Sequence, residues 1–286
     1  MFTDRFFTAP DGPSLHYRDY TGDAARPPVL CLHGLTRNAR DFESVALRLQ
    51  AHGWRVIVPD VRGRGASAWA DPASYALPTY LADMDALFAD AGIDCAVYIG
   101  TSMGALLTML TAAARPGRVI AAVLNDIGPV IERAGLERIA SYIHQTAPMP
   151  DWHAAAARFA RADGPTFPDY TAADWDTHAR RRARLSEDGL VHLDYDPALA
   201  ATFSPTAGNA EEMLWPLFRA LAGIPLLSVR GELSDLFTAD TQVAMAAQCE
   251  GMGVAVVPRA GHAPSLEEAE AEAAIDRLLD DVLTRG

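Results

Sequence analysis

Short, continuous hydrophobic runs alternate along the chain with longer segments whose hydrophobic positions recur every three to four residues. The run at 28–33 (PVLCLH) is typical of a strand buried on both faces of a parallel sheet. Further along, Phe42, Val45 and Leu49 lie on one face of a predicted helix that stops before Gly53, a favoured helix end. Strands and helices in this alternation predict a parallel sheet covered by helices on both faces. The expected strands are 28–33, 55–61, 96–100, 118–125, 225–230 and 254–258, and the expected helices are 41–52, 80–91, 103–114, 239–250 and 266–283.

Two parts of the chain depart from this alternation. Near the N-terminus, extended segments at 5–9 and 14–20 flank a Pro-Asp-Gly-Pro turn and predict a hairpin. From 128 to 222 no buried strand is apparent, and segments rich in Ala, Arg, Trp and His alternate with Pro-containing turns. We therefore expect an α/β fold with a mostly parallel, doubly wound sheet, formed by residues 1–127 and 223–286, and a helical cap inserted at 128–222.

Composition excludes several classes of function. Of the 286 residues, 24 are basic and 37 acidic, which gives a net charge of −13, and all the basic residues are arginines. Because Schiff-base aldolases, pyridoxal-phosphate enzymes, Walker-type phosphate loops and protein kinases all need a lysine, this protein is none of them. The negative charge argues against nucleic acids and membranes as partners. The one basic cluster, at 180–184, is interpreted as a solvated helix face.

We expect a cytoplasmic protein without a metal or other cofactor. Cys31, Cys95 and Cys249 lie far apart and do not form the close pairs of zinc or redox motifs. The sequence has no dinucleotide-binding glycine loop and no cluster of metal ligands. The N-terminus does not look like a secretion signal, and no apolar run approaches the length of a membrane span.

The strongest chemical signal is Gly100-Thr101-Ser102-Met103-Gly104, a G-x-S-x-G motif between a predicted strand and a predicted helix. In that context the motif is a nucleophile elbow, in which a strained serine projects its hydroxyl from a tight turn. Glycines flank the serine because side chains there would collide. Ser102 is therefore the candidate nucleophile.

A serine nucleophile needs a base and an oxyanion hole. His262, just after the last predicted strand, is the best candidate base, because loops gather at the carboxyl edge of a parallel sheet. The backbone N–H groups of Met103 and Leu35 are the expected oxyanion-hole donors. His33, two residues before Leu35, is expected to hold its own loop in place.

The ordered motifs HGL at 33–35, PDVRGRGAS at 59–67, GTSMG at 100–104 and AGHAP at 260–264 resemble those of the α/β-hydrolase superfamily across nearly the whole chain. The resemblance implies that the 128–222 insertion forms one wall of the substrate pocket.

The resemblance also implies an acid that orients the histidine, and two positions are candidates. Most relatives carry this acid in a G-x-x-D pattern after the seventh strand, but here the pattern position is Ser234, with Asp235 one residue later. A subset of relatives carries it after the sixth strand, where this chain has Asp126. We prefer Asp126 and keep Asp235 as the alternative.

Three residues are candidates for binding the substrate. Arg37 follows the oxyanion loop and could hold a substrate carboxylate. The sequence supports at least as well the alternative that Arg37 is a solvated residue at the start of a helix. Trp152 and Trp215 of the expected cap are candidates for lining the pocket, although cap helices also need a core and packing is the interpretation we favour for most of the cap tryptophans.

These residues predict a serine hydrolase that cleaves an ester, lactone or related acyl bond of a small molecule through a Ser-His-Asp triad and an acyl-enzyme. One alternative is a carbon–carbon bond hydrolase acting on a diketone-like ring-fission product. Another is a ligand receptor of the same fold with slow turnover. The expected partner is a small-molecule substrate, and the acidic, Ala-rich sequence is compatible with a monomer or a homodimer.

Overall fold

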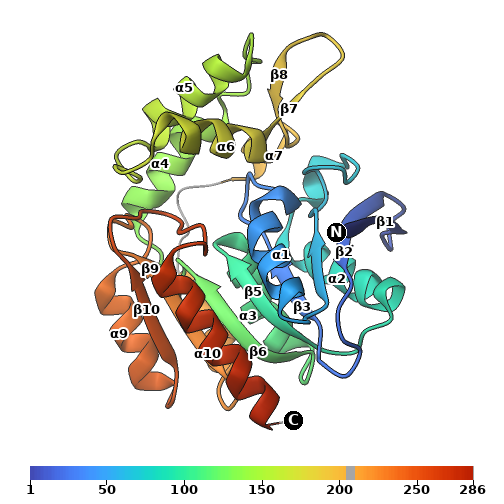
Figure 1. Ribbon diagram of the computed structural model, residues 1–286, viewed down its shortest axis with the longest axis vertical. Coiled ribbons are helices and arrows are strands. Elements are labelled where there is room, and N and C mark those ends of the chain that lie inside the picture. The colour runs from blue at the N-terminus through green and yellow to red at the C-terminus, as the bar shows by residue number, and fades with distance from the viewer. Residues whose placement is uncertain (204–209, 286) are drawn as a thin grey trace.

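The computed structural model describes residues 1–203 and 210–285 and contains an eight-stranded sheet with helices on both faces (Figure 1). The strand order is β1-β2-β4-β3-β5-β6-β9-β10. The β1–β2 and β2–β4 pairs are antiparallel, and the pairs from β4 to β10 are parallel. The predicted N-terminal hairpin and the mostly parallel, doubly wound sheet are therefore confirmed.

The elements lie within a few residues of the predicted ranges. The strands of the sheet are β1 (Phe2–Thr8), β2 (Ser14–Tyr20), β3 (Val29–Leu32), β4 (Val56–Pro59), β5 (Ala96–Thr101), β6 (Val119–Asn125), β9 (Leu226–Gly231) and β10 (Gly253–Val257). The helices that accompany them are the 3₁₀ turns η1 (Ala39–Phe42) and η2 (Pro72–Ser74), and α1 (Glu43–Ala51), α2 (Leu77–Ala91), α3 (Met103–Ala114), α9 (Ala239–Gln248) and α10 (Ala269–Arg285).

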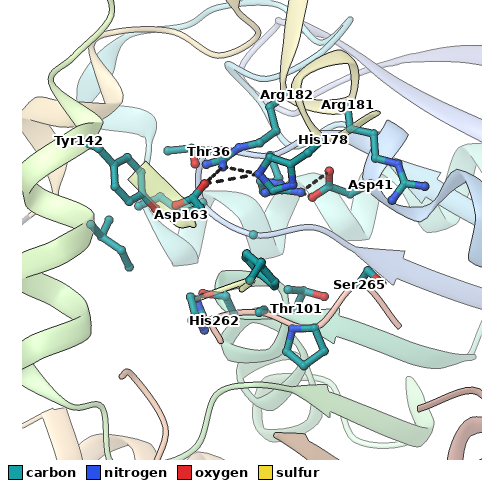
Figure 2. A pocket seen from close by; sticks show the side chains of 18 of the residues that line it. Thr36, Asp41, Thr101, Tyr142, Asp163, His178, Arg181, Arg182, His262 and Ser265 are labelled. Atoms are coloured by element: carbon teal, nitrogen blue, oxygen red, sulfur yellow. Dashed lines mark hydrogen bonds and ion pairs between the residues drawn. The ribbon is translucent and has the colours of Figure 1, made fainter. Parts of the chain in front are cut away.

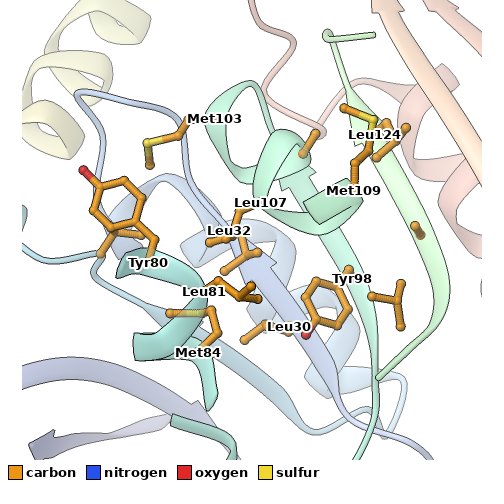
Figure 3. Packing of buried hydrophobic residues seen from close by; sticks show 14 of the residues in the cluster. Leu30, Leu32, Tyr80, Leu81, Met84, Tyr98, Met103, Leu107, Met109 and Leu124 are labelled. Carbon is orange, nitrogen blue, oxygen red and sulfur yellow. The ribbon is translucent and has the colours of Figure 1, made fainter. Parts of the chain in front are cut away.

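Alternate residues of the buried strands face two separate hydrophobic cores. On β3, Leu30 and Leu32 contribute to the core that also holds residues of α2 and α3 (Figure 3). Val29 and Cys31, which alternate with these leucines along β3, contribute to the core on the other face, beneath α1 and α10. Because both faces are covered, the strand is hydrophobic throughout, which is the pattern its sequence shows.

The segment between β6 and β9 contains α4 (Arg133–Ile143), α5 (Trp152–Asp163), α6 (Ala172–Arg182), α7 (Leu199–Thr202) and α8 (Ala210–Arg219), together with a two-stranded antiparallel sheet of β7 (Ala183–Leu185) and β8 (Val191–Leu193). Figure 1 shows α4, α5 and α6 beyond one end of the main sheet. The β7–β8 pair was not expected, because each strand is only three residues long. Helix α8 packs against α3, and its Phe218 is buried in the core of that face.

The carboxyl ends of the parallel strands meet at one edge of the sheet, as this topology requires. Ser102 directly follows β5, Asp126 follows β6, and His262 lies five residues after β10. In the described part of the chain, no helix has the length and apolar character needed to cross a membrane.

Candidate active site

Ser102 occupies a sharp turn between β5 and α3, with φ 53° and ψ −115°. This positive φ is unfavourable for a residue with a side chain, so the surrounding structure must hold it in place. The Ser102 N–H donates to the Asn125 carbonyl at 3.0 Å, and the Asn125 amide donates to Thr101 Oγ1 and the Pro264 carbonyl at 3.0 and 2.9 Å. Asn125 thus joins the serine turn to the loop that carries His262.

The two glycines of the motif are required by close backbone contacts. A Cβ on Gly104 would lie 2.0 Å from the Leu32 carbonyl oxygen, because α3 begins directly against β3. A Cβ on Gly100 would lie 2.6 Å from backbone atoms of the first turn of α3. Glycine is therefore needed at both positions because the start of α3 packs closely against the sheet.

Ser102, His262 and Asp126 form a continuous hydrogen-bonded chain. His262 Nε2 is 2.9 Å from Ser102 Oγ, and His262 Nδ1 is 2.8 Å from Asp126 Oδ2. Because an ionised carboxylate only accepts hydrogen bonds, Nδ1 carries the proton of the neutral imidazole and Nε2 is free to accept from the serine hydroxyl. This is the arrangement in which a histidine can take the serine proton.

Asp126 is fully buried and its carboxylate is held from three sides. The Gly231 N–H donates to Oδ1 at 2.7 Å, and the Ser234 hydroxyl donates to Oδ2 at 2.7 Å. The third contact is with His262. These bonds compensate for the loss of water around a buried charge.

Asp235, the alternative acid, is directed elsewhere. Both of its oxygens accept hydrogen bonds from the Arg138 guanidinium, at 2.5 and 2.8 Å. Burial alone would raise the pKa of Asp235, but Arg138 lowers it below its usual value. Of the two candidate acids, only Asp126 lies against His262.

The loop after β3 is held by His33, which is fully buried. Its Nδ1 donates to the Gly34 carbonyl at 2.8 Å, and its Nε2 accepts from the Val61 N–H at 3.0 Å. Burial lowers the pKa of His33, so the ring stays neutral. The prediction that His33 holds its own loop is confirmed.

Of the expected oxyanion donors, Met103 directly follows Ser102, and Leu35 follows Gly34, which lies close to Ser102. Neither N–H donates to a protein acceptor within the described residues. Both residues contact Arg64. Arg64 Nε donates to the Leu35 carbonyl at 2.9 Å, and Nη2 lies 3.6 Å from Met103 Sδ. Arg64 is fully buried, and burial lowers its pKa. This guanidinium therefore links the Leu35 carbonyl to the Met103 side chain.

A cavity of about 90 Å³ lies over Ser102 and His262, and ion pairs from the β6–β9 segment and the β3 loop border it (Figure 2). Arg182 Nη1 lies 2.5 Å from Asp163 Oδ2 and 2.8 Å from His178 Nε2. Burial raises the pKa of Asp163, but Arg182 and a hydrogen bond with His178 lower it more strongly. Burial is also the main reason that the pKa of His178 falls to about 4, and Arg182 and Arg37 lower it further. At neutral pH, His178 is therefore an uncharged group of this cavity.

The predicted substrate-binding residues occupy different positions. Arg37 lines the cavity, but its guanidinium is paired with Asp41 through two hydrogen bonds. Trp152 and Trp215 are not among the lining residues: Trp152 lies under the Arg180 guanidinium at 4.7 Å, and Trp215 packs against the Phe218 ring at 5.8 Å. Neither tryptophan therefore lines this cavity, and both make packing contacts instead.

The basic cluster at 180–184 is not one solvated face. Arg180 and Arg184 are exposed, but Arg182 is buried at the cavity, and Arg181 pairs with Glu267 at 2.6 Å. Asp163 also borders the cavity, as does His178, which the sequence favours as a structural or solvated histidine. The one sequence signal for this cluster is the four-residue spacing of His178 and Arg182, which places them on the same side of a helix.

Within the part of the chain that the structure covers, no group of three or more His, Cys, Asp or Glu side chains could hold a metal ion.

The model of the alpha/beta hydrolase family matches residues 29–275, and the chain belongs to that family. The resemblance inferred from the motifs is thus confirmed. The structure superposes with a TM-score of 0.93 on an alpha/beta hydrolase from Novosphingobium aromaticivorans that is 48% identical, with 98% of each chain covered. The chain is 37% identical to the 3-hydroxybutyrate-oligomer hydrolase of Cupriavidus necator, over 85% of each protein. It is 28% identical to the 2-(acetamidomethylene)succinate hydrolase of Mesorhizobium japonicum, over 82% of this chain and 81% of that protein.

Proposed function

We propose that this protein is a serine hydrolase that cleaves a carboxylic ester through an acyl-enzyme. The observation that carries the proposal is the hydrogen-bonded chain from Ser102 Oγ through His262 to the buried Asp126 carboxylate. Asp126 fixes the proton on His262 Nδ1, so that Nε2 faces the serine as a base.

The geometry supports the following steps. His262 takes the hydroxyl proton while Ser102 Oγ attacks the ester carbonyl carbon, and the N–H groups of Leu35 and Met103 stabilise the oxyanion. The carbon–oxygen bond to the leaving alcohol then breaks, and His262 gives that alcohol its proton. Water, deprotonated by His262, attacks the acyl-enzyme, and the proton returns to Ser102 as the acid is released.

One of these relatives favours an ester as the bond. In an oligomer of 3-hydroxybutyrate, the substrate in the name of the Cupriavidus enzyme, ester bonds join the hydroxy-acid units. That relative is 37% identical to this chain over 85% of each protein.

The proposal is tested by the turnover of 4-nitrophenyl butanoate in ¹⁸O-labelled water, by the wild type and by Ser102→Ala. We expect release of nitrophenol, one ¹⁸O atom in each butanoate formed, and loss of turnover in the variant by a factor of about 10³ or more. Undiminished turnover by Ser102→Ala would overturn the assignment of the nucleophile. Absence of turnover in the folded wild type, on this ester and on longer and shorter acyl chains, would count against ester hydrolysis.

A further inference from the structure

A second, larger cavity adjoins the cavity over Ser102. It has a volume of about 660 Å³, within the range of small-molecule sites. It lies between α4, α5 and the segment that joins them, and Thr36, Tyr142 and the Arg182–Asp163 pair border both cavities. The second cavity is therefore next to the cavity over Ser102, and these shared side chains form the boundary between them.

The lining of the second cavity carries a strong excess of positive charge. Four arginines, Arg138, Arg158, Arg161 and Arg182, line it with a single carboxylate, that of Asp163. Arg138 is paired with Asp235, and Arg182 with Asp163. The whole protein has a net charge of −13, so the four guanidinium groups around this cavity contrast with the overall negative charge.

Two of the four arginines have no carboxylate partner among the described residues, namely Arg158 and Arg161, which are three positions apart on α5. Arg158 is half-buried, and its guanidinium donates to the backbone carbonyls of Gln145 and Ala147. These two bonds fix the position of the group, and its other N–H donors have no partner among the described residues.

The positive charges of Arg182 and Arg161 also repel the positive charge of Arg158. Burial lowers the pKa of Arg158, and the charges of Arg182 and Arg161 lower it further. A bound anion would relieve this repulsion, and a guanidinium binds a carboxylate through two parallel hydrogen bonds.

We propose that the second cavity binds a carboxylate of the substrate, with Arg158 as the principal ligand and Arg161 beside it. The substrates of Ser102 are then esters that carry a free carboxylate at the end of a short chain. This inference rests on the proposed function, because it names the substrate class of the same serine.

The test compares 4-nitrophenyl hemiesters of glutaric, adipic and suberic acid with the same esters bearing a terminal primary amide in place of the carboxylate. The amide has nearly the same size but no charge. The wild type, Arg158→Gln, Arg158→Lys and Arg133→Gln are measured. Arg133 is an exposed arginine of α4 that lines neither cavity and pairs with Glu137, so its variant controls for the loss of one positive charge.

We expect the wild type to prefer the carboxylate over the amide at one chain length or more. Arg158→Gln should raise KM for that hemiester about tenfold and leave kcat/KM for the amide within a factor of about two. Arg158→Lys should recover part of the loss, because it keeps the charge but not the paired donors. Arg133→Gln should behave as the wild type.

Labelling of Ser102 by a fluorophosphonate separates failure of the inference from failure of the proposed function. If Ser102 is labelled and the amides are cleaved as well as the carboxylates, or if Arg158→Gln impairs both equally, the carboxylate site is wrong and the hydrolase assignment stands. If Ser102 takes no label and neither series is cleaved, the proposed function fails and the inference falls with it.

Discussion

Ser234 donates a hydrogen bond of 2.7 Å to Asp126 Oδ2, the carboxylate oxygen that also contacts His262. Ser234 occupies the position at which the family resemblance, through the G-x-x-D pattern, implies an acid. In this chain the carboxylate comes from the end of β6, and the position after β9 supplies a hydroxyl that supports it. Position 126, after β6, therefore supplies the carboxylate, and position 234, after the neighbouring strand β9, supplies a hydrogen bond to it.

Replacement of each candidate acid by asparagine should separate their roles. Asp126→Asn leaves the size of the side chain unchanged but favours the wrong tautomer of His262, so kcat should fall by about 10³- to 10⁴-fold. Asp235→Asn weakens the pairing with Arg138 and should lower kcat by less than about tenfold. Steady-state rates on 4-nitrophenyl butanoate measure both. Equal losses, or a larger loss for Asp235→Asn, would contradict the assignment of Asp126.

The acid should be movable from position 126 to position 234. Because Ser234 Oγ already lies within hydrogen-bond distance of the oxygen that faces His262, a carboxylate at position 234 can approach the imidazole. We expect Ser234→Asp to restore activity to Asp126→Asn by about tenfold or more. In the wild-type background, the same change adds a second negative charge beside Asp126 and should lower stability. A folded double variant no more active than Asp126→Asn would show that position 234 does not reach the histidine.

Arg64 should act as a positioning residue for the oxyanion hole. It holds the Leu35 carbonyl at 2.9 Å and contacts Met103, so its loss should let both N–H groups shift relative to Ser102. We expect Arg64→Met to lower kcat by about 10- to 100-fold with little change in KM, because the N–H groups act mainly on the transition state. Arg62→Met is the matched control, since Arg62 is equally buried but pairs with Asp83 and Asp11. Equal effects on kcat at equal stability would indicate a purely structural role for Arg64.

His178 should make the protein less stable in mild acid. Its pKa is lowered to about 4 in the folded protein, chiefly by burial, whereas an unfolded histidine binds a proton near pH 6.5. The unfolded state therefore binds more protons between these values, and the free energy of unfolding should fall as pH falls from about 6.5 towards 4, by roughly 3 kcal/mol at most.

Urea denaturation at several pH values compares the wild type with His178→Gln, which cannot take up this proton. The variant should lose less stability between pH 6.5 and 4.5. His153→Gln, at an exposed position of α5, should follow the wild type. Identical pH dependence for His178→Gln and the wild type would refute the buried, neutral state of His178.

The sheet could be predicted because its strands are buried on both faces and therefore read as continuous apolar runs, as in Val29 to Leu32. Ser102 and His262 could be placed because motif and strand order bring them to the same edge. The choice between Asp126 and Asp235 depended on where one side chain points, which sequence spacing does not determine. The Arg182–Asp163 pair joins two helices of the insertion, and only their packing reveals that Arg182 is buried. Whether Trp152 and Trp215 pack or line a cavity depends on the same helix packing.

The most direct test of the central claim is peptide mass analysis after treatment with a fluorophosphonate, applied to the wild type, Ser102→Ala and Asp126→Asn. If His262, oriented by Asp126, activates Ser102, the wild type should carry one adduct, on the peptide that contains Ser102. The adduct should be absent from Ser102→Ala and should form far more slowly on Asp126→Asn. An adduct on another residue, or equally fast labelling of Asp126→Asn, would contradict the account.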